Sequence, residues 1–236
     1  MSVKTIWLDN PPVNAISPAI VEHVREEIAD LGDARCVVLR GRGERAFSAG
    51  ADIGGFASLD GEAPAGLTPL THELEALPVP VVAAIHGFCL GGGLEVALAC
   101  DLRIATPDAQ FGFPEVNLGL LPGGGGTQRA PRLVGAGRAA WLIMSGERIP
   151  AEQAAQWGLV EFVVDDLDAG IDRIAGKLAE QSPHAVAQIK SLLVATREAA
   201  DYDREIAGFF ECLQSPDGQE GIAAFFEKRP PRWSVG

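Results

Sequence analysis

Short apolar runs that alternate with segments of helical periodicity are the feature that most constrains the fold of this chain. Residues 36–39, 80–85 and 102–105 form apolar runs too short for buried helices, so we expect buried strands there. Between such runs, Ser17 and Pro18 provide an N-cap and a first-position proline for a helix. Strands that alternate with helices pair mostly in parallel. The sequence therefore predicts an α/β fold.

The pattern changes after residue 165, where consecutive segments all read as helices. We expect a core over residues 1–165 and a helical C-terminal region over residues 166–236, attached as an appendage. This region carries four of the ten phenylalanines, at positions 209, 210, 225 and 226. An exposed patch of that size is a liability on a monomer, so the tail predicts an oligomer. The alternative is that the tail docks on the α/β core of its own chain.

Charge excludes one class of function and restricts how the chain stabilises anions. The 236 residues carry a formal net charge of −13, whereas nucleic-acid binding needs clustered Lys and Arg. We therefore expect no nucleic-acid partner and no attraction to an anionic membrane surface. No Lys or Arg occurs between Arg45 and Arg103. An anion held by that stretch must be stabilised by backbone dipoles.

Cysteine usage and hydropathy predict a cytoplasmic protein. The four cysteines have no C-x-x-C spacing, which is typical of buried thiols in a reducing compartment. They lie at positions 36, 89, 100 and 212. No apolar run approaches the roughly 20 residues of a membrane helix, and the N-terminal residues lack a signal-peptide layout.

Two glutamates are the candidate acid–base groups. Glu95 follows three consecutive glycines and a leucine, and Glu115 follows a proline in an apolar stretch. Two such carboxylates can move protons beside a carbonyl whose oxygen becomes an anion. Each also has a structural interpretation: an acid in the first turn of a helix is favoured by the helix dipole, and an exposed glutamate after a proline is common.

Two small-residue turns are the candidate anion-binding elements. Gly91, Gly92 and Gly93 lie where a strand meets a helix, and residues 49–52 (Ala-Gly-Ala-Asp) form a second turn. An oxyanion hole needs two N–H donors that converge from different segments. The alternatives are a plain strand-to-helix turn and a loop in which Asp52 caps a helix. A third glycine-rich segment, residues 122–127, either positions a ligand or is a plain turn before a helix.

These motifs together resemble the enoyl-CoA hydratase/isomerase (crotonase) superfamily. The resemblance covers nearly the whole chain, and residues 10–16 are most similar to the hydratase/isomerase part of the fatty-acid β-oxidation multifunctional enzyme. The segments that carry it are residues 47–53, 84–87, 91–95, 111–115, 119–122, 125–129 and 220–229.

The resemblance implies a crotonase-like spiral of ββα units with a C-terminal helical trimerisation region, and an acyl-CoA thioester substrate. It places the oxyanion-hole N–H groups at Ala51 and Gly92 and the catalytic carboxylates at Glu95 and Glu115. It implies a homotrimer or a dimer of trimers and no cofactor, since coenzyme A is part of the substrate. Substrate contacts are expected at Ala49, Asp52, Ile53, Gly91, Pro122 and Gly123.

The resemblance implies an enoyl-CoA hydratase, because both carboxylates are present. The alternative is a Δ3,Δ2-enoyl-CoA isomerase. The acidic composition disfavours an RNA-binding member of the superfamily, and the intact carboxylate pair disfavours any noncatalytic member. The chain departs from the family at residues 54 and 55, where glycines replace a basic residue near the coenzyme. Cations for the coenzyme phosphates must come from elsewhere. The candidates are Arg40, Arg42, Arg45, Lys228 and Arg229.

Overall fold

The computed structural model describes residues 2–52, 66–195 and 202–232, and it confirms the α/β class. One sheet has five strands in the order β1-β2-β4-β6-β9, and the other has four in the order β3-β5-β7-β8. All neighbouring strands pair in parallel except β7 and β8. The strands are β1 (Ser2–Leu8), β2 (Ala34–Gly41), β3 (Ala46–Ser48), β4 (Val81–Ile85), β5 (Phe88–Leu90), β6 (Leu102–Ala105), β7 (Gln110–Gly112), β8 (Arg148–Pro150) and β9 (Phe162–Val163).

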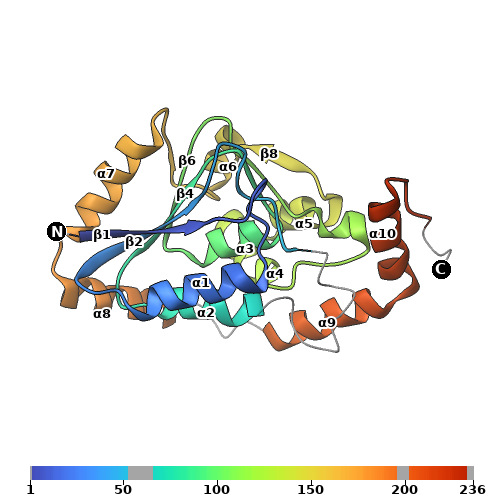
Figure 1. Cartoon of the computed structure of the whole chain (residues 1–236), viewed down its shortest axis with the longest axis horizontal. Coiled ribbons are helices and arrows are strands. Elements are labelled where there is room, and N and C mark those ends of the chain that lie inside the picture. The colour runs from blue at the N-terminus through green and yellow to red at the C-terminus, as the bar shows by residue number, and fades with distance from the viewer. Residues whose placement is uncertain (1, 53–65, 196–201, 233–236) are drawn as a thin grey trace.

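Helices cover the sheets and continue into the tail (Figure 1). None in the described part of the chain is both long and apolar enough to cross a membrane. They are α1 (Pro18–Ala29), α2 (Leu67–Ala76), α3 (Gly92–Ala99), the 3₁₀ helix η3 (Pro114–Leu118), α4 (Gly126–Val134), α5 (Ala136–Ser145), α6 (Ala151–Trp157), α7 (Leu167–Ala179), α8 (Pro183–Ala195), α9 (Tyr202–Gln214) and α10 (Pro216–Glu227).

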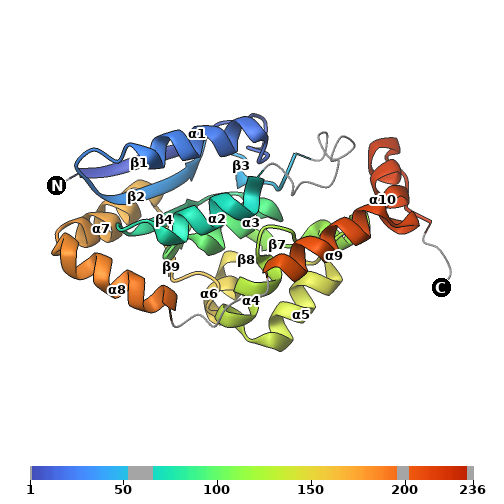
Figure 2. The same cartoon turned by 90° about the horizontal axis from the view of Figure 1, so that it is seen from below.

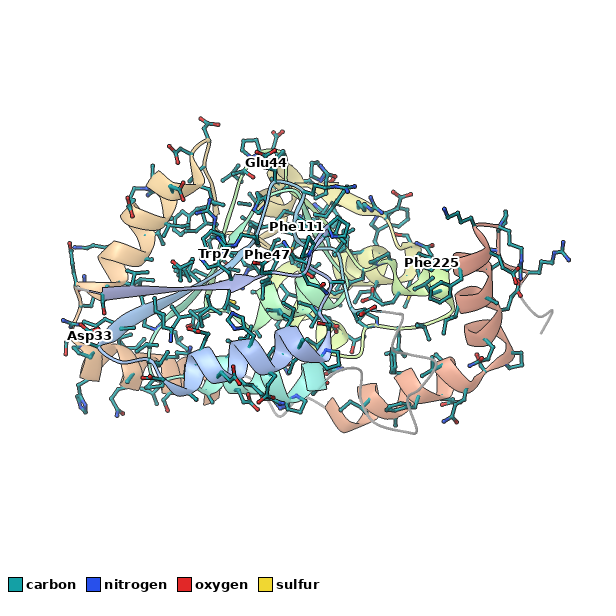
Figure 3. All side chains as sticks on the ribbon, in the orientation of Figure 1. Trp7, Asp33, Glu44, Phe47, Phe111 and Phe225 are labelled. Atoms are coloured by element: carbon teal, nitrogen blue, oxygen red, sulfur yellow. The ribbon has the colours of Figure 1, made fainter. Side chains whose placement is uncertain are left out.

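Burial on both faces explains why the central strands are continuous apolar runs. Val37 and Leu39 on β2 pack into the core on the side of α1, α2 and α3, whereas Val38 packs against α7 on the other face. Parallel sheets covered by helices on both faces show this composition. Figure 1 shows α7 on one side of the sheet and α1 and α2 on the other. Phe47 on β3 and Phe111 on β7, both in the smaller sheet, are fully buried in the interior (Figure 3).

The starts of α1 and α2 show where local signals succeed and fail. Ser17 is the N-cap of α1, as predicted, and its Oγ accepts a hydrogen bond from the Ile20 N–H at 3.4 Å. Thr68 followed by Pro69 is an equally typical start signal and predicts a cap at Thr68, but this prediction is wrong, because the N-cap residue of α2 is Gly66. Thr68 instead lies inside the helix and its Oγ1 donates to the Gly123 carbonyl at 2.7 Å. The Thr68 hydroxyl therefore donates to a distant carbonyl instead of accepting from an N–H group of its own helix.

Helix α8 is attached to the α/β core by one buried lysine. The Nζ of Lys190 lies 2.8 Å from Oδ2 of Asp101 and donates to the carbonyls of Leu74 and Val79 at 3.2 and 3.1 Å. Only 6% of Lys190 is exposed. Three apolar side chains of α8 are exposed, those of Ile189, Leu192 and Leu193.

The last two helices extend away from the core at the end opposite the N-terminus (Figures 1 and 2). Phe209 and Leu213 of α9 form a small buried cluster with Leu120. Phe225 and Phe226 on α10 are 51% and 58% exposed. Helix α9 is thus docked on the core, whereas α10 exposes apolar side chains at the surface. The division at residue 165 stays a prediction.

Replacement of the lysine that holds α8 should destabilise the protein. Lys190→Met leaves Asp101 and two inward-facing carbonyls without their cation, so we expect the free energy of unfolding to fall by roughly 2–3 kcal/mol. Urea denaturation measures this. Lys177→Met is the control, because Lys177 pairs with Glu180 at the surface of α7 and should change stability by less than about 0.5 kcal/mol. Equal losses in the two variants would contradict this account.

Candidate active site

Glu95 is held by the amino-terminal end of another helix. It lies in the first turn of α3, as predicted, and is 1% exposed. Its Oε1 accepts hydrogen bonds from the N–H groups of Gly124 and Gly126, at 2.7 and 2.8 Å. Both donors belong to the segment that begins α4, where unpaired N–H groups favour negative charge. The environment therefore stabilises the ionised carboxylate.

The glycine-rich segment around residue 124 owes its composition to this contact. A Cβ atom at Gly124 would lie 2.8 Å from Oε2 of Glu95, and one at Gly126 would lie 3.0 Å from Oε1. Sequence reasoning left open a ligand-positioning loop or a plain turn. The structure shows that residues 124–126 are a turn that wraps a glutamate side chain.

A buried ion pair fixes this glycine turn, and sequence reasoning missed it. Arg129 donates to both carboxylate oxygens of Glu75 at 3.1 and 2.7 Å, and its third contact is the Gly124 carbonyl at 2.8 Å. Thr71 donates to the same carbonyl at 3.2 Å. Only 8% of Glu75 and 3% of Arg129 are exposed. The signal in the sequence was Glu75, an acidic residue among the apolar residues of the buried face of α2, which calls for a buried cation.

Glu115 lies close to the glycine turn that follows β5. It occupies the first turn of η3, directly after Pro114, and is half-buried as expected. A Cβ atom at Gly91 would lie 2.7 Å from Oε1 of Glu115. Gly91 also has φ 50°, a left-handed conformation that favours glycine. Gly91 therefore makes room for the second carboxylate.

The two predicted backbone donors are neighbours. Ile16 donates to the Gly50 carbonyl and accepts from the Asp52 N–H, so in the described part of the chain the N–H of Ala51 makes no hydrogen bond. Gly92 is the first residue of α3, and an N–H at that position has no acceptor within its helix. A Cβ atom at Gly92 would lie 3.3 Å from the Ala51 nitrogen. Two N–H donors from separate segments therefore converge.

Both glutamates and both donors line one cavity of about 440 Å³. Ala49, Gly91 and Gly123, which the resemblance proposes as substrate contacts, also line it. Its other lining residues are Val13, Gly50, Leu67, Phe88, Leu90, Pro114, Asn117, Leu118, Leu120, Leu121, Arg148, Phe209 and Phe225.

Two predicted contact residues, Asp52 and Pro122, do not line the cavity. The side chain of Asp52 is exposed outside the lining, and Pro122 is buried behind Gly126, where an added Cβ would lie 2.9 Å from the Pro122 Cβ. Ile53 lies outside the described residues.

The tail helices complete the cavity wall. Phe209 of α9 packs against Gly123, where a Cβ would lie 3.0 Å from its ring. Phe225 is on the side of α10 that faces the core (Figure 3). With Leu118, Leu120 and Leu121 they make one end of the cavity apolar. The sequence suggested the tail phenylalanines for assembly and did not place any of them at the site.

The nearest thiol is not a competing nucleophile. Cys89 lies on β5 between two cavity-lining residues, but its side chain is fully buried. Burial raises the pKa of the Cys89 thiol well above its usual range, so the reactive thiolate is suppressed. Cys36 and Cys100 are buried too, as predicted, and burial raises the pKa of each to about 12.

The geometry therefore places two carboxylates and two neighbouring backbone N–H donors on one apolar cavity, an arrangement that suits proton transfer beside a carbonyl. Comparison with known proteins identifies the family. The model of the enoyl-CoA hydratase/isomerase family matches residues 1–235. A probable enoyl-CoA hydratase of Bacillus subtilis is 42% identical over 98% of this chain and 95% of its own. The chain belongs to the enoyl-CoA hydratase/isomerase family.

Two further relatives agree with this assignment. The peroxisomal bifunctional enzyme of Cavia porcellus is 46% identical over 70% of this chain, which corresponds to 23% of that protein. This match confirms the similarity to one part of a multifunctional enzyme. The crystal structure of an enoyl-CoA hydratase from Mycobacterium avium subsp. paratuberculosis superposes with a TM-score of 0.87 at 30% identity, and the match covers 99% of this chain and 95% of that one.

Two glycine variants should separate backbone strain from contact with the site. Gly32 and Gly91 have nearly the same φ, 54° and 50°, but a Cβ at Gly32 would meet no atom within 4 Å. Gly32→Ala should lower the unfolding free energy by about 1–2 kcal/mol, the strain of an alanine in the left-handed conformation. Gly91→Ala should cost more, because it must displace Glu115 and because φ 50° with ψ −128° is a conformation that only glycine adopts readily. Urea denaturation of both variants measures the difference, and equal costs would show that Glu115 does not press on Gly91.

Proposed function

We propose that this chain is an enoyl-CoA hydratase that adds water across the 2,3 double bond of 2-enoyl-CoA thioesters to give 3-hydroxyacyl-CoA. The observation that carries the proposal is the presence of Glu95 and Glu115 on the same cavity as the N–H groups of Ala51 and Gly92. Hydration needs one proton removed from water and one delivered to carbon, and two positioned carboxylates supply both. The names of the relatives support the same activity.

In the proposed reaction the two N–H donors bind the thioester oxygen. Negative charge builds on this oxygen when water attacks C3, and the donors stabilise that charge without a side-chain cation. Loss of one donor of this kind typically raises a barrier by about 3–4 kcal/mol. The α3 helix adds its amino-terminal dipole at Gly92. The absence of Lys and Arg from residues 46–102 is compatible with this arrangement.

The surroundings of the two glutamates favour different roles. Glu95 receives two N–H donors, which stabilise its ionised form and suit a base that takes a proton from the attacking water. Glu115 then delivers a proton to C2, and the enolate becomes the 3-hydroxyacyl thioester. The cycle leaves Glu95 protonated and Glu115 ionised, and exchange with solvent restores both. Carboxylates and backbone donors suffice for this chemistry, so we assign no cofactor.

The same-class alternative is a Δ3,Δ2-enoyl-CoA isomerase, in which one carboxylate moves a proton from C2 to C4. That reaction leaves the second carboxylate without a task, whereas hydration employs both. The net charge of −13 disfavours RNA binding, and the intact pair of carboxylates disfavours both an RNA-binding and another noncatalytic role. The cytoplasmic location stays a prediction from the cysteine pattern.

Assembly as a homotrimer or a dimer of trimers is part of the proposal. Apolar side chains are exposed on α8 and α10, the helices of the predicted trimerisation region. A second copy of the chain would cover them. Phe225 both lines the cavity and is 51% exposed, so contact at α10 would also close one wall of the site.

Loss of either carboxylate should abolish most of the activity. Glu95→Gln and Glu115→Gln keep the shape of the side chain but cannot transfer the proton, so we expect kcat to fall by at least ~10²-fold. A spectrophotometric assay that follows loss of the double bond of crotonyl-CoA measures this. Coenzyme A affinity, measured by titration calorimetry, should be largely kept and is the control for folding. Near-normal turnover in either variant would refute the proposed mechanism.

Light scattering tests the assembly. We expect three or six times the chain mass of 24.8 kDa for the wild type. Phe226→Ser removes an exposed ring of α10 that does not line the cavity and should shift the protein toward smaller species. Val163→Ser, at an exposed apolar position on β9, is the control and should leave the mass unchanged. A fully active wild type with the mass of one chain would contradict the proposal.

A further inference from the structure

Arg148 places a cation in a cavity whose other described lining residues include no Lys or Arg. It lies at the start of β8, and its side chain is exposed. Its guanidinium carbon is 5.2 Å from the centre of the Phe88 ring, which also lines the cavity. Pairing of Arg148 with Gly112 across β7 and β8 fixes its position. An arginine stacked on an aromatic ring keeps its N–H fork available for an anion.

The basic residues favoured by the sequence are placed less suitably. Arg40 pairs with Asp168, and Arg42 lies 3.5 Å from Asp9. Arg229 pairs with both Glu220 and Glu227. None of the five candidates, which also included Arg45 and Lys228, lines the cavity. Arg148, by contrast, forms no ion pair with any acidic side chain in the described part of the chain.

The position of Arg148 indicates which end of the cavity it serves. Through Gly112, Arg148 is level with Leu90, and its guanidinium reaches back along β5 to Phe88, away from Gly91. Phe88 and Gly91 are three positions apart, about 10 Å of extended chain at 3.3 Å per residue. An anion held beside Phe88 therefore lies on the side of Arg148 away from the oxyanion hole at Gly92. The apolar end, with Phe209 against Gly123, lies on the side of Glu95 and its glycine turn. An aliphatic acyl group suits that end, which leaves the Phe88 end for the other part of the thioester.

We propose that Arg148 binds a phosphate group of the coenzyme A portion of the substrate and thereby fixes the direction in which the thioester enters the cavity. The inference rests on the proposed function, because it takes the ligand to be a coenzyme A thioester. Arginine forms paired, charge-assisted hydrogen bonds with phosphate oxygens. On a chain with a net charge of −13, an anionic ligand requires a local cation of this kind.

Titration calorimetry with coenzyme A and with pantetheine, which lacks the phosphates, tests the assignment without any turnover. Arg148→Gln should weaken coenzyme A binding by about tenfold, the effect of one charge-assisted contact, and should leave pantetheine binding unchanged. Arg148→Lys keeps the charge and should recover part of the loss. Dephospho-coenzyme A identifies the group: a loss that persists with this ligand assigns the diphosphate, and one that disappears assigns the 3′-phosphate.

Arg138→Gln is the matched control, because Arg138 is also exposed and lies 5.5 Å from an aromatic ring, that of Trp157, away from the cavity. It should bind coenzyme A like the wild type. Coenzyme A affinity unchanged in Arg148→Gln, or an equal loss for pantetheine, would overturn the assignment.

Kinetics keep this test separate from the proposed function. For crotonyl-CoA, Arg148→Gln should raise KM by about tenfold and keep kcat, whereas KM for crotonyl-pantetheine should not change. If the wild type hydrates neither thioester, the proposed function fails, and the calorimetric result still decides whether Arg148 binds a phosphate. A fall in kcat with both thioesters would instead indicate a structural role for Arg148.

Discussion

The site depends on the contact between the Glu95 carboxylate and the amino-terminal end of α4. A carboxylate that is 1% exposed is costly to bury unless hydrogen bonds compensate for lost water, and here Gly124 and Gly126 provide two of them. That contact requires glycine in the turn. A buried ion pair, Glu75 with Arg129, also holds the Gly124 carbonyl in place. Helices α2, α3 and α4 are thereby locked around one charged group.

In the proposed reaction, backbone dipoles stabilise the developing negative charge. Ala51 and Gly92 line the cavity, and no lysine or arginine occurs between residues 45 and 103. Fixed dipoles in a site lined by apolar side chains need little reorganisation when charge develops. A cation would serve a different purpose, recognition of a ligand's own charge, and Arg148 stands at the cavity wall beside Phe88.

The C-terminal helices belong to the site as well as to the proposed assembly. Phe209 is buried against the Gly123 turn, and Phe225 reaches the cavity from α10 while half of it stays exposed. The acyl end of the cavity is therefore built by residues more than 80 positions after the turn they contact. This arrangement links the shape of the substrate pocket to the surface on which a second copy of the chain would pack.

Local patterns in the sequence determined the α/β class, the strands at residues 36–39 and 102–105, the Ser17 cap and the positions of the two acids, because burial periodicity and turn chemistry act over a few residues. The resemblance added Ala51 and Gly92 as donors. Only the tertiary structure decided that Thr68 bonds Gly123 instead of capping its helix and that a glycine turn wraps Glu95. It also decided that Arg148, and not Arg40 or Arg42, lines the cavity. Each of these depends on which distant segments meet, and packing of the whole chain sets that.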